Sequence, residues 1–468
     1  MLEFKQYEVE IVNPIVFFTS DRIDIIIKYL YAISILSGKG QDFYKKLYLD
    51  HINAFNGFVE ADDTNKVGSE SFDNNFRALL KSIQEHGFDD KHIIPVQANG
   101  IPLDGAHRIA IAMALGLQVK TFKICDTKPV CFNLAFFNNR GMENFEIDFI
   151  AEQYAHIKPN VFLVMVWPIA KGHQKEIENV LSKSGTIIYQ KDIRLTMNGM
   201  VNLQRQVYQK EQWLGSYSND FEGVWLKASQ CYSEDGKMRV FLYESTANLI
   251  QVKEEIRSLF NIGKHSVHIN DTHEETIELA NILFNNNSIL FLNCATRKNL
   301  NKYRKLLSEY KKAIPIPNVD DFAIIGGVMS EFGIRDANDL DYITTNSSFP
   351  DHITSKIEKE TKKLKYTNVK ISELIYNPRH YFKVNGLKFV CPQIILEIKK
   401  TRNNDSDKED ILYLKKIVND STTKLSITEI IKQYLSLSFY RREVKILLLK
   451  VRFLIYSLIN GKYRKSYT

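Results

Sequence analysis

The sequence predicts a mixed α+β protein built from several domains, and three observations support this. The chain has 468 residues, more than one hydrophobic core usually organises, and a prior of roughly 100–200 residues per domain gives about three domains. Hydrophobic residues make up 44% of the chain and charged residues 25%, which is the composition of a globular protein rather than a disordered one. Short apolar, strand-like runs alternate with helical patterns along most of the chain.

Charge and cysteine content narrow the function classes only slightly. The formal net charge of +7 favours phosphate-bearing ligands or anionic surfaces, but it is too small to indicate nucleic-acid binding by itself. The five cysteines include no CxxC pair, which argues against a structural zinc site and a disulfide framework. The first residues lack a secretory pattern, and no apolar run approaches the roughly 20 residues that span a bilayer, so we expect a cytoplasmic protein.

We expect four segments along the chain. The first covers residues 1–155, the second residues 156–312 and the third residues 313–425. The third begins near the sequence IPIPN, where two prolines make a plausible linker. The last segment, residues 426–468, differs in composition from the other three.

A tight turn from a strand into a helix marks the first segment. The run HIIPVQANGIPLDGAHRIAIAMALG passes from an apolar strand through a glycine-containing turn into an Ala-rich helix. The N–H groups of such a helix start, together with an arginine, can hold a phosphate. Residues 70–125 resemble the ParB/sulfiredoxin-like fold, and this resemblance implies that Gly105, His107 and Arg108 bind nucleotide phosphates. Alternatively, His107 and Arg108 only cap and solvate the helix start.

The second segment contains a histidine in a distinctive setting. The run GKHSVHINDTHEETIELANILF, which holds His268, resembles the active-site segment of nucleoside diphosphate kinases. The strand-like runs VFLVMV, GTIIYQ and MRVFLYE precede it in the order of that family. The resemblance implies a ferredoxin-like domain in which His268 carries phosphate, with Arg257 and Lys264 as charge partners and Tyr208 and Trp213 near the nucleotide.

Three residues of this segment depart from the kinase pattern. Trp167 stands where the family has a lysine, and Ile269 and Asn270 replace the Gly-Ser that follows the histidine. A different substrate or a loss of activity would explain these departures. The residues alone allow another interpretation, in which His268 is an ordinary polar residue in a strand-to-helix turn, ahead of a helix capped at Asp271 or Thr272.

The third segment carries paired carboxylates. In FAIIGGVMSEFGIRDANDLDYIT, a strand runs into Gly326 and Gly327, and Asp339 and Asp341 follow after a short helix. Period-two alternation puts both aspartates on one side of a strand, where they can bind Mg²⁺ that bridges nucleotide phosphates. The pattern resembles the nucleotidyltransferase superfamily, an α/β domain here followed by C-terminal helices. The resemblance implies that the two glycines bind nucleotide and that the two aspartates are catalytic metal ligands.

Further charges in this segment are open to two interpretations. The resemblance calls for a third metal-binding carboxylate from a neighbouring strand, and Glu373 in NVKISEL is the best candidate. Asp339 and Asp341 could instead belong to a turn rich in Asp and Asn. We expect the later charges of the segment to be solvated at a helix boundary: Lys399, Arg402, Lys408 and Asp410.

The last segment reads as a basic amphipathic helix. SFYRREVKILLLKVRFLIYSLINGKYRKSYT interleaves apolar residues with many Lys and Arg residues and has Glu443 as its one acid. Two interpretations stay open. The helix either contacts anionic lipid peripherally at the inner face of the membrane, or it packs on the third domain with its basic edge in water.

The resemblances together imply a nucleotide-dependent phosphotransferase or nucleotidyltransferase. It would use Mg²⁺ and ATP or another nucleoside triphosphate, and would act on a small metabolite or a glycan precursor, with bacterial surface-polysaccharide biosynthesis as one context. The alternative is a non-catalytic nucleotide-sensing or scaffold protein. ParB-like DNA binding ranks last, because no basic helix-turn-helix segment follows the turn.

Overall fold

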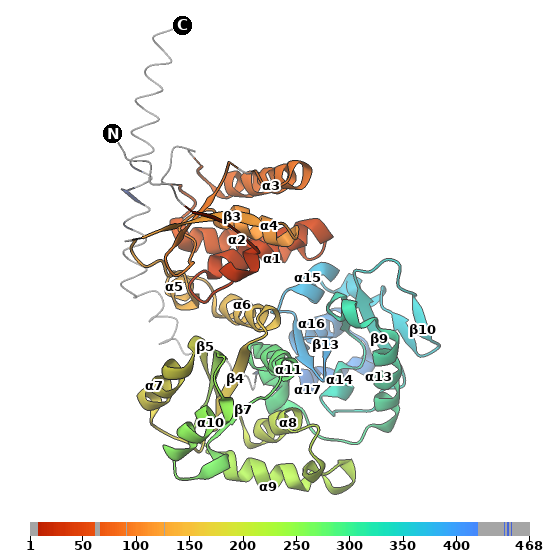
Figure 1. Cartoon of the computed structure of the whole chain (residues 1–468). Helices are drawn as coiled ribbons and strands as arrows, with labels where there is room; N and C mark the ends of the chain where they lie inside the picture. The colour runs from red at the N-terminus through yellow and green to blue at the C-terminus, as the bar shows by residue number, and fades with distance from the viewer. Residues whose placement is uncertain are drawn as a thin grey trace, which may run out of the picture. The chain divides into compact units, whose positions relative to one another are not determined.

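The computed structural model describes residues 8–60, 66–89, 91–125 and 127–419, together with Val444, Leu447, Leu448 and Val451. The chain is a mixed α+β protein, as the sequence predicts. It divides into two compact units: one extends to Ile150, and the other begins at Ala151 and holds the rest of the continuous described chain (Figure 1). The basic amphipathic segment expected at 426–468 lies outside the described residues, apart from the four just named.

The first unit is built on a three-stranded sheet with the order β1-β3-β2. β1 runs antiparallel to β3, whereas β2 runs parallel to it. The strands are β1 (Val9–Val12), β2 (Ile94–Gln97) and β3 (Val119–Ile124). The helices are α1 (Ile23–Ser37), α2 (Gln41–Asn56), α3 (Ser69–His86), α4 (Ala106–Ala114), α5 (Leu134–Asn138) and the start of α6 (Asn144–Ile157).

Helix α1 is the centre of this unit because it is apolar on most of its surface. Ile23, Ile25, Ile26 and Ile27 are all fully buried, and the helix packs against both α2 and α4. It ends where Gly38 takes a left-handed conformation (φ +73°), which costs glycine little. The strand and helix expected on either side of the glycine turn are confirmed as β2 and α4.

The second unit contains two sheets. The first is four-stranded and antiparallel throughout, with the order β5-β6-β4-β7. Its strands are β4 (Val161–Val166), β5 (Thr186–Ile193), β6 (Met238–Glu244) and β7 (Val267–Ile269). The helices around it are α7 (Gln174–Ser184), α8 (Met197–Val207), α9 (Glu222–Cys231), α10 (Leu249–Ser258), α11 (His273–Leu283) and α12 (Asn286–Cys294).

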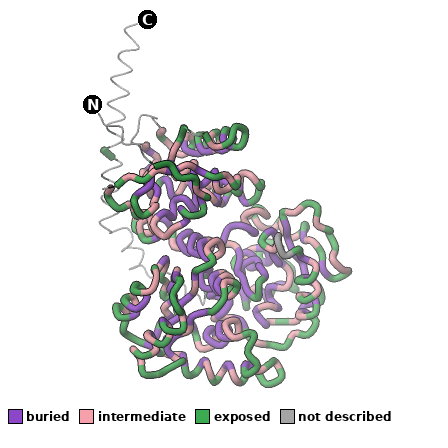
Figure 2. The backbone as a smooth tube through the Cα atoms, viewed as in Figure 1, coloured by how far each residue is buried: buried purple, intermediate pink, exposed green. Residues whose placement is uncertain are grey.

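The strands of this sheet are apolar, and helices pack against the sheet. Val164 and Val166 of β4 share one hydrophobic cluster with apolar residues of α7 and α10, and α11 packs on β4 as well. Buried residues run through the strands and the inward faces of the helices, as Figure 2 shows. A strand covered on both faces reads as a continuous apolar run, which is why VFLVMV was recognisable as a strand.

The second sheet of this unit is six-stranded and mixed, with the order β10-β11-β9-β8-β13-β12. β8 and β9 are antiparallel, while β9 pairs with β11, and β8 with β13, in parallel. The strands are β8 (Phe322–Ile324), β9 (Leu340–Thr344), β10 (His352–Thr354), β11 (Ile357–Lys359), β12 (Tyr381–Val384) and β13 (Leu387–Val390). The helices are α13 (Asn301–Ala313), α14 (Val328–Glu331), α15 (Ile371–Tyr376), α16 (Pro392–Arg402) and α17 (Lys408–Asn419).

Polar contacts join the two sheets into one unit. The Asn287 side chain at the start of α12 donates to the carbonyls of Pro378, Arg379 and Tyr381. Lys383 of β12 is buried and forms an ion pair of 2.9 Å with Glu152. The segments 156–312 and 313–425 therefore each have a sheet of their own but share one compact unit.

The charges expected to be solvated at the boundary between α16 and α17 are partly buried. Lys399 pairs with both Asp407 and Asp410 at 2.8 Å, and Arg402 pairs with Asp407 at 2.6 Å. Lys399 and Asp410 are 8% and 4% exposed, so the prediction of solvation is wrong for them, whereas Lys408 is exposed. The reason is that α17 folds back against α16 and covers the junction.

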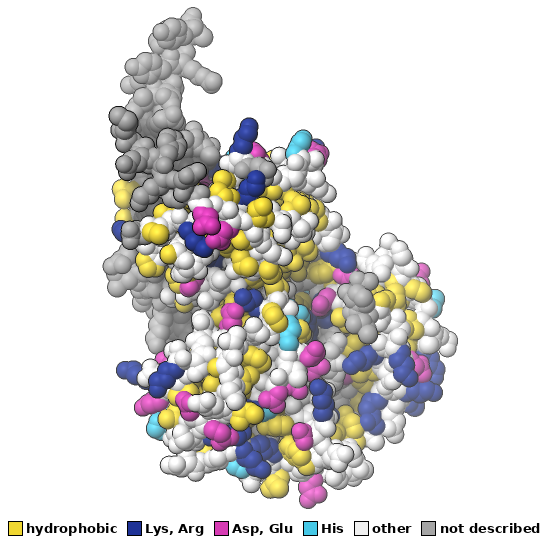
Figure 3. Space-filling view, in the orientation of Figure 1, with side chains coloured by type: hydrophobic (Ala, Val, Ile, Leu, Met, Phe, Trp, Pro, Cys, Tyr) yellow, Lys and Arg dark blue, Asp and Glu magenta, His cyan; other side chains and the backbone are white. Residues whose placement is uncertain are grey.

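The five cysteines form no disulfide within the described residues. No helix within the described residues is long and apolar enough to cross a membrane. Lys and Arg side chains gather over α13 in the space-filling view (Figure 3).

Candidate functional site

The turn between β2 and α4 has a backbone that requires glycine. Gly105 is the N-cap of α4 with φ +79°, and a Cβ atom there would lie 2.6 Å from Cδ1 of Ile94. Its N–H donates to the carboxylate of Asp104 at 2.6 Å, which fixes the turn. The first N–H groups of α4 have no partner inside the helix and carry the positive end of its dipole.

This turn opens onto a cavity of about 970 Å³. The cavity lies over the start of α4 and along α3, and its volume is near the upper end of the roughly 300–1,000 Å³ common for small-molecule sites. Gly105, His107 and Arg108, the three residues expected to bind phosphate, all line it. The structure therefore brings this predicted set together at one cavity.

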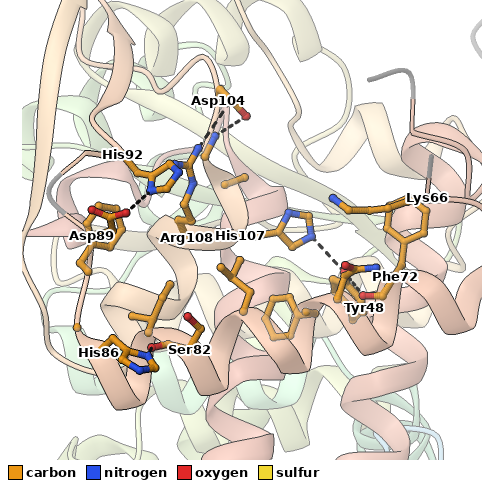
Figure 4. Close-up of a pocket in the computed structure, with 18 residues that line it drawn as sticks. Tyr48, Lys66, Phe72, Ser82, His86, Asp89, His92, Asp104, His107 and Arg108 are labelled. Atoms are coloured by element: carbon orange, nitrogen blue, oxygen red, sulfur yellow. Dashed lines mark hydrogen bonds and ion pairs between the residues drawn. The ribbon is translucent and has the colours of Figure 1, made fainter. Parts of the chain in front are cut away.

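Basic groups stand on both sides of the cavity (Figure 4). Arg108 is 24% exposed at its side chain, and its closest acidic group is Asp104 at 3.9 Å, too far for a strong pair. Lys66 lies near His107, while His92 lines the same cavity as Arg108 and forms a pair of 3.1 Å with Asp89. Arg108 is thus available to an anion that enters the cavity.

Helix α3 contributes both apolar and polar residues to the cavity. Phe72, Phe76, Leu79 and Ile83 line it beside Asn75, Ser82 and His86. Apolar side chains and cations at one cavity suit a ligand with a flat apolar part and an anionic part.

His107 is oriented differently from the expected phosphate contact. Its Nε2 lies 3.1 Å from the Tyr48 hydroxyl, and its ring packs against those of Tyr48 and Phe76. Burial, with the charges of Lys28, His51 and Lys66, holds the pKa of His107 well below its usual range. The imidazole is therefore neutral, and it supports the cavity wall from a half-buried position.

Buried charges anchor the loop that precedes the turn. Arg22 donates to the carbonyl of Pro102 and pairs with Asp24 at 2.9 Å, and Lys28 pairs with the same carboxylate at 3.0 Å. Burial alone would raise the pKa of Asp24, but Lys28 and Arg22 lower it far below its usual range. The loop is thus held by ionised groups that cannot move without separating buried charges.

His268 lies in a strand rather than in the strand-to-helix turn. It is in β7 opposite Met165 of β4, and its Nδ1 is 3.4 Å from the Tyr208 hydroxyl. Tyr208 packs in turn on Trp213, so the expected aromatic pair does adjoin the histidine. Burial lowers the pKa of His268 to about 3, and Lys253, Lys227 and Arg257 act in the same direction.

The cations around His268 differ in part from the expected ones. Arg257 is close enough to influence it, as are Lys253 and Lys227. Lys264 is exposed, and its charge acts on Lys227 and His265 instead. Among the departures, Trp167 is fully buried, and Asn270 accepts from the Leu163 N–H and so ties β7 to β4. Thr272 caps α11 by accepting from the Glu275 N–H, which is one of the two caps that the sequence suggested.

Asp341 is not free to bind a cation. It is 5% exposed in β9, and its carboxylate is paired with the ammonium group of Lys363, which also pairs with Glu360 at 2.9 Å. Burial raises the pKa of Asp341, although Lys363 acts against it. Asp339 is exposed just before the strand. Gly326 faces this carboxylate directly, since a Cβ atom there would lie 2.2 Å from Oδ2 of Asp341.

Glu373 is not on a neighbouring strand. It lies in the first turn of α15, and its carboxylate accepts from the Asn377 amide at 2.8 Å. The two strands beside β9 are β8 and β11, and in β11 Glu358 stands opposite Asp341. Within the described residues no group of three or more His, Cys, Asp or Glu side chains is arranged to hold a metal ion. In this arrangement the ammonium group of Lys363 occupies the Asp341 carboxylate.

Several residues of these sites have no signal in the local sequence. They come from other helices, strands and loops than the predicted residues: Lys66, His86 and His92 at the cavity, Lys227 and Lys253 near His268, and Glu360 and Lys363 beside Asp341. The i,i+3 spacing of Glu360 and Lys363 could have suggested a local pair. Nothing in the sequence pointed to Asp341 as their shared partner.

No family model, curated protein or solved structure matches this chain.

Proposed function

We propose that the first unit binds a nucleoside triphosphate in the cavity beside α4 and that the protein is a nucleotide-dependent phosphotransferase. The observation that carries this is the coincidence of a helix start, a weakly paired arginine and apolar side chains at one cavity of about 970 Å³. The phosphates would lie against the Gly105–Arg108 turn, where N–H donors and a guanidinium converge. The base would lie along the apolar residues of α3.

The His92–Asp89 pair is the best-placed general base. Its two side chains line the same cavity as Arg108, and a carboxylate that holds one imidazole nitrogen leaves the other to accept a proton. The acceptor hydroxyl would lose its proton to His92 Nε2 as its oxygen bonds to the γ-phosphorus, and the bond to the nucleoside diphosphate would break. Mg²⁺ would enter with the nucleotide as the counter-charge of its phosphates.

The acceptor is proposed only as a class. A small metabolite or a glycan precursor with a free hydroxyl fits a cavity that still has room beside the nucleotide. A role in bacterial surface-polysaccharide biosynthesis stays a proposal, as do a cytoplasmic location and a peripheral membrane contact of residues 426–468.

The finer domain assignments are proposals of the same kind. The order β5-β6-β4-β7, with α7 between β4 and β5, α8 and α9 between β5 and β6, and α10 between β6 and β7, supports a ferredoxin-like, nucleoside diphosphate kinase-like domain. The Gly326-Gly327 turn between antiparallel β8 and β9 supports a nucleotidyltransferase-like domain. The order β1-β3-β2 and the turn before α4 support a ParB/sulfiredoxin-like domain.

A non-catalytic nucleotide-sensing or scaffold role for the protein is the second candidate, and features of the unit that begins at Ala151 favour it. Lys363 stands between Asp341 and Glu360, where a catalytic cation would be needed, and Trp167 fills the position of a phosphate-binding lysine. This unit would then bind nucleotide without turning it over. DNA binding ranks below both.

Calorimetric titration of the full chain with ATP, CTP, GTP and UTP in the presence of Mg²⁺ tests the proposal. One triphosphate should bind the wild type, and Arg108→Gln should weaken that binding at least tenfold, because a charge-assisted contact contributes about 1.5–3 kcal/mol. Lys81→Gln is the matched control: it removes a cation from the exposed side of α3 outside the cavity, and should change affinity less than twofold. Equal affinities of wild type and Arg108→Gln would contradict the site.

Turnover distinguishes the two candidate functions. Release of labelled nucleoside diphosphate from the γ-labelled triphosphate, reduced at least a hundredfold in His92→Asn with binding intact, supports a phosphotransferase. Tight binding with no release in the presence of pooled hydroxyl acceptors supports the sensing role instead.

A further inference from the structure

A second cavity lies in the unit that begins at Ala151. Its volume is about 140 Å³, well below the roughly 300–1,000 Å³ of sites that enclose drug-sized molecules, so it suits a small ion or group rather than a nucleoside. It lies among α8, α13 and α14. Basic and polar side chains line much of it: Asn202, Arg205, Gln206, Lys298, Arg304 and Ser330.

Aromatic rings fix the two arginines of this cavity. The guanidinium carbon of Arg205 stands 4.0 Å from the ring centre of Phe221, and that of Arg304 stands 4.2 Å from the ring centre of Tyr217. Arg205 also donates to the Tyr217 hydroxyl at 3.2 Å. Stacking of this kind orients a guanidinium without consuming its in-plane N–H donors. Both arginines are therefore held in place before any ligand arrives.

The Nε donors of three arginines in this region have no acceptor among the described residues. The Nε atoms of Arg205, Arg304 and the neighbouring Arg297 are buried and, among the described residues, lack a hydrogen-bond partner. Arg304 uses its terminal nitrogen for Asn299 and Asn301. Buried donors are nearly always paired in folded proteins, and an exception calls for an explanation. An anion in the cavity would provide the missing acceptor.

Positive charge predominates beside the cavity. Burial lowers the pKa of the Arg297 guanidinium, the charge of Asp220 raises it, and the charge of Arg205 lowers it. Helix α13, which carries Arg304, has five basic residues against one acid in the sequence NKYRKLLSEYKKA, and dark-blue side chains cover this area in Figure 3. The field of such a surface attracts anions.

One acidic side chain, Glu331 of α14, also lines the cavity. Its carboxyl accepts from the Tyr303 hydroxyl at 2.8 Å. Burial raises the pKa of this carboxyl, whereas the Tyr303 hydrogen bond and the charge of Arg205 act in the opposite direction.

We propose that this cavity binds a phosphate or diphosphate group, held by the guanidinium groups of Arg205 and Arg304 and by polar side chains of α8 and α14. Two guanidinium groups with fixed planes match the oxygens of such a group. The site is separate from the cavity at α4 and does not depend on the function proposed for it.

Calorimetric titrations with inorganic phosphate, pyrophosphate and sodium chloride as a salt control test this. The full chain carrying Arg108→Gln is the background, so that binding at the α4 turn does not contribute. Pyrophosphate or phosphate should bind with one site per chain, and adding Arg304→Gln or Arg205→Gln should weaken binding at least tenfold. Adding Lys305→Gln should change it less than twofold, because this control removes a cation from the residue next to Arg304 but outside the cavity. A nucleoside diphosphate arm identifies the source: tighter binding than pyrophosphate means that the group belongs to a nucleotide.

Glu331→Gln is a variant that should not weaken anion binding, in contrast to the arginine variants. It keeps the shape of the side chain and removes any negative charge, so the affinity for pyrophosphate at pH 8 should stay the same or increase. The proposal is overturned if neither anion binds the Arg108→Gln protein, or if the arginine variants, shown by circular dichroism to be folded, bind as tightly as the Lys305→Gln control.

Discussion

Two glycine turns of this molecule lead from a strand into a helix, and they differ in what surrounds them. The turn at Gly105 borders a cavity of about 970 Å³ in which Arg108 has only a weak partner. The turn at Gly326 faces Asp341, whose carboxylate is already paired with Lys363. The two turns share a local sequence pattern, but the charged side chain is weakly paired at the first turn and fully paired at the second. Side chains from elsewhere in the chain therefore decide which turn can accept a ligand.

The largest effect should come from the buried charges behind the first turn. Asp24→Ala leaves Arg22 and Lys28 buried without their shared carboxylate, and breaking such a pair costs about 3–5 kcal/mol. Urea denaturation of the full chain measures it. Glu85→Ala, which breaks an exposed pair with Lys81, should cost less than about 1 kcal/mol. Similar losses in both variants would mean that the first turn is not anchored by these charges.

Removing the ammonium group of Lys363 should make the carboxylate at the second turn available, as Arg108 is at the first. Lys363→Met leaves the carboxylates of Asp341 and Glu360 unpaired, and should lower the free energy of unfolding by about 2–3 kcal/mol. Millimolar Mg²⁺ should recover part of the loss, because two adjacent carboxylates suit a hard cation. Thermal denaturation with and without Mg²⁺ tests both points, with Lys362→Met on the exposed side as the control. No response of Lys363→Met to Mg²⁺ would contradict this account of the site.

A third site, at His268, should make the free energy of unfolding depend on pH. Because its folded pKa of about 3 lies below the unfolded value near 6.5, the unfolded chain takes up a proton first as the pH falls. Stability is therefore full above pH 6.5 and is lost between pH 6.5 and about 3, by at most about 1.4 kcal/mol per pH unit. His268→Gln should lose less stability than the wild type between pH 7 and 5. Parallel losses in denaturation at the two pH values would show that His268 titrates normally.

The smallest effect should follow a change at Glu373. Its carboxylate has a neighbour on the same helix, Asn377, as its partner, and it belongs to none of the groups around Asp341. Glu373→Gln should change the unfolding free energy by less than about 1 kcal/mol and leave any Mg²⁺ response of the Lys363→Met protein unaltered. Loss of that response in the double variant would return Glu373 to the metal site.

The sequence by itself determined the strong local elements. The runs IPVQ, VFLVMV and MRVFLYE were recognisable as strands, and the helix after Gly105 followed from its turn and its alanines, because apolar runs and turn residues act over a few positions. The mixed α+β class followed from the alternation of such elements. The candidate cavity residues Gly105, His107 and Arg108 could be named because they are adjacent in the chain.

Only the tertiary structure decided which of these residues are available. His107 turns to Tyr48, Asp341 is held by Lys363, and Glu373 lies on a helix. The arginine-lined cavity of the second unit joins residues about a hundred positions apart, such as Arg205 and Arg304, so no local pattern could reveal it. Ion pairs and cavities depend on the distances between elements after they pack together. Local sequence patterns do not reveal that packing, and for this reason the sites could be located only in the tertiary structure.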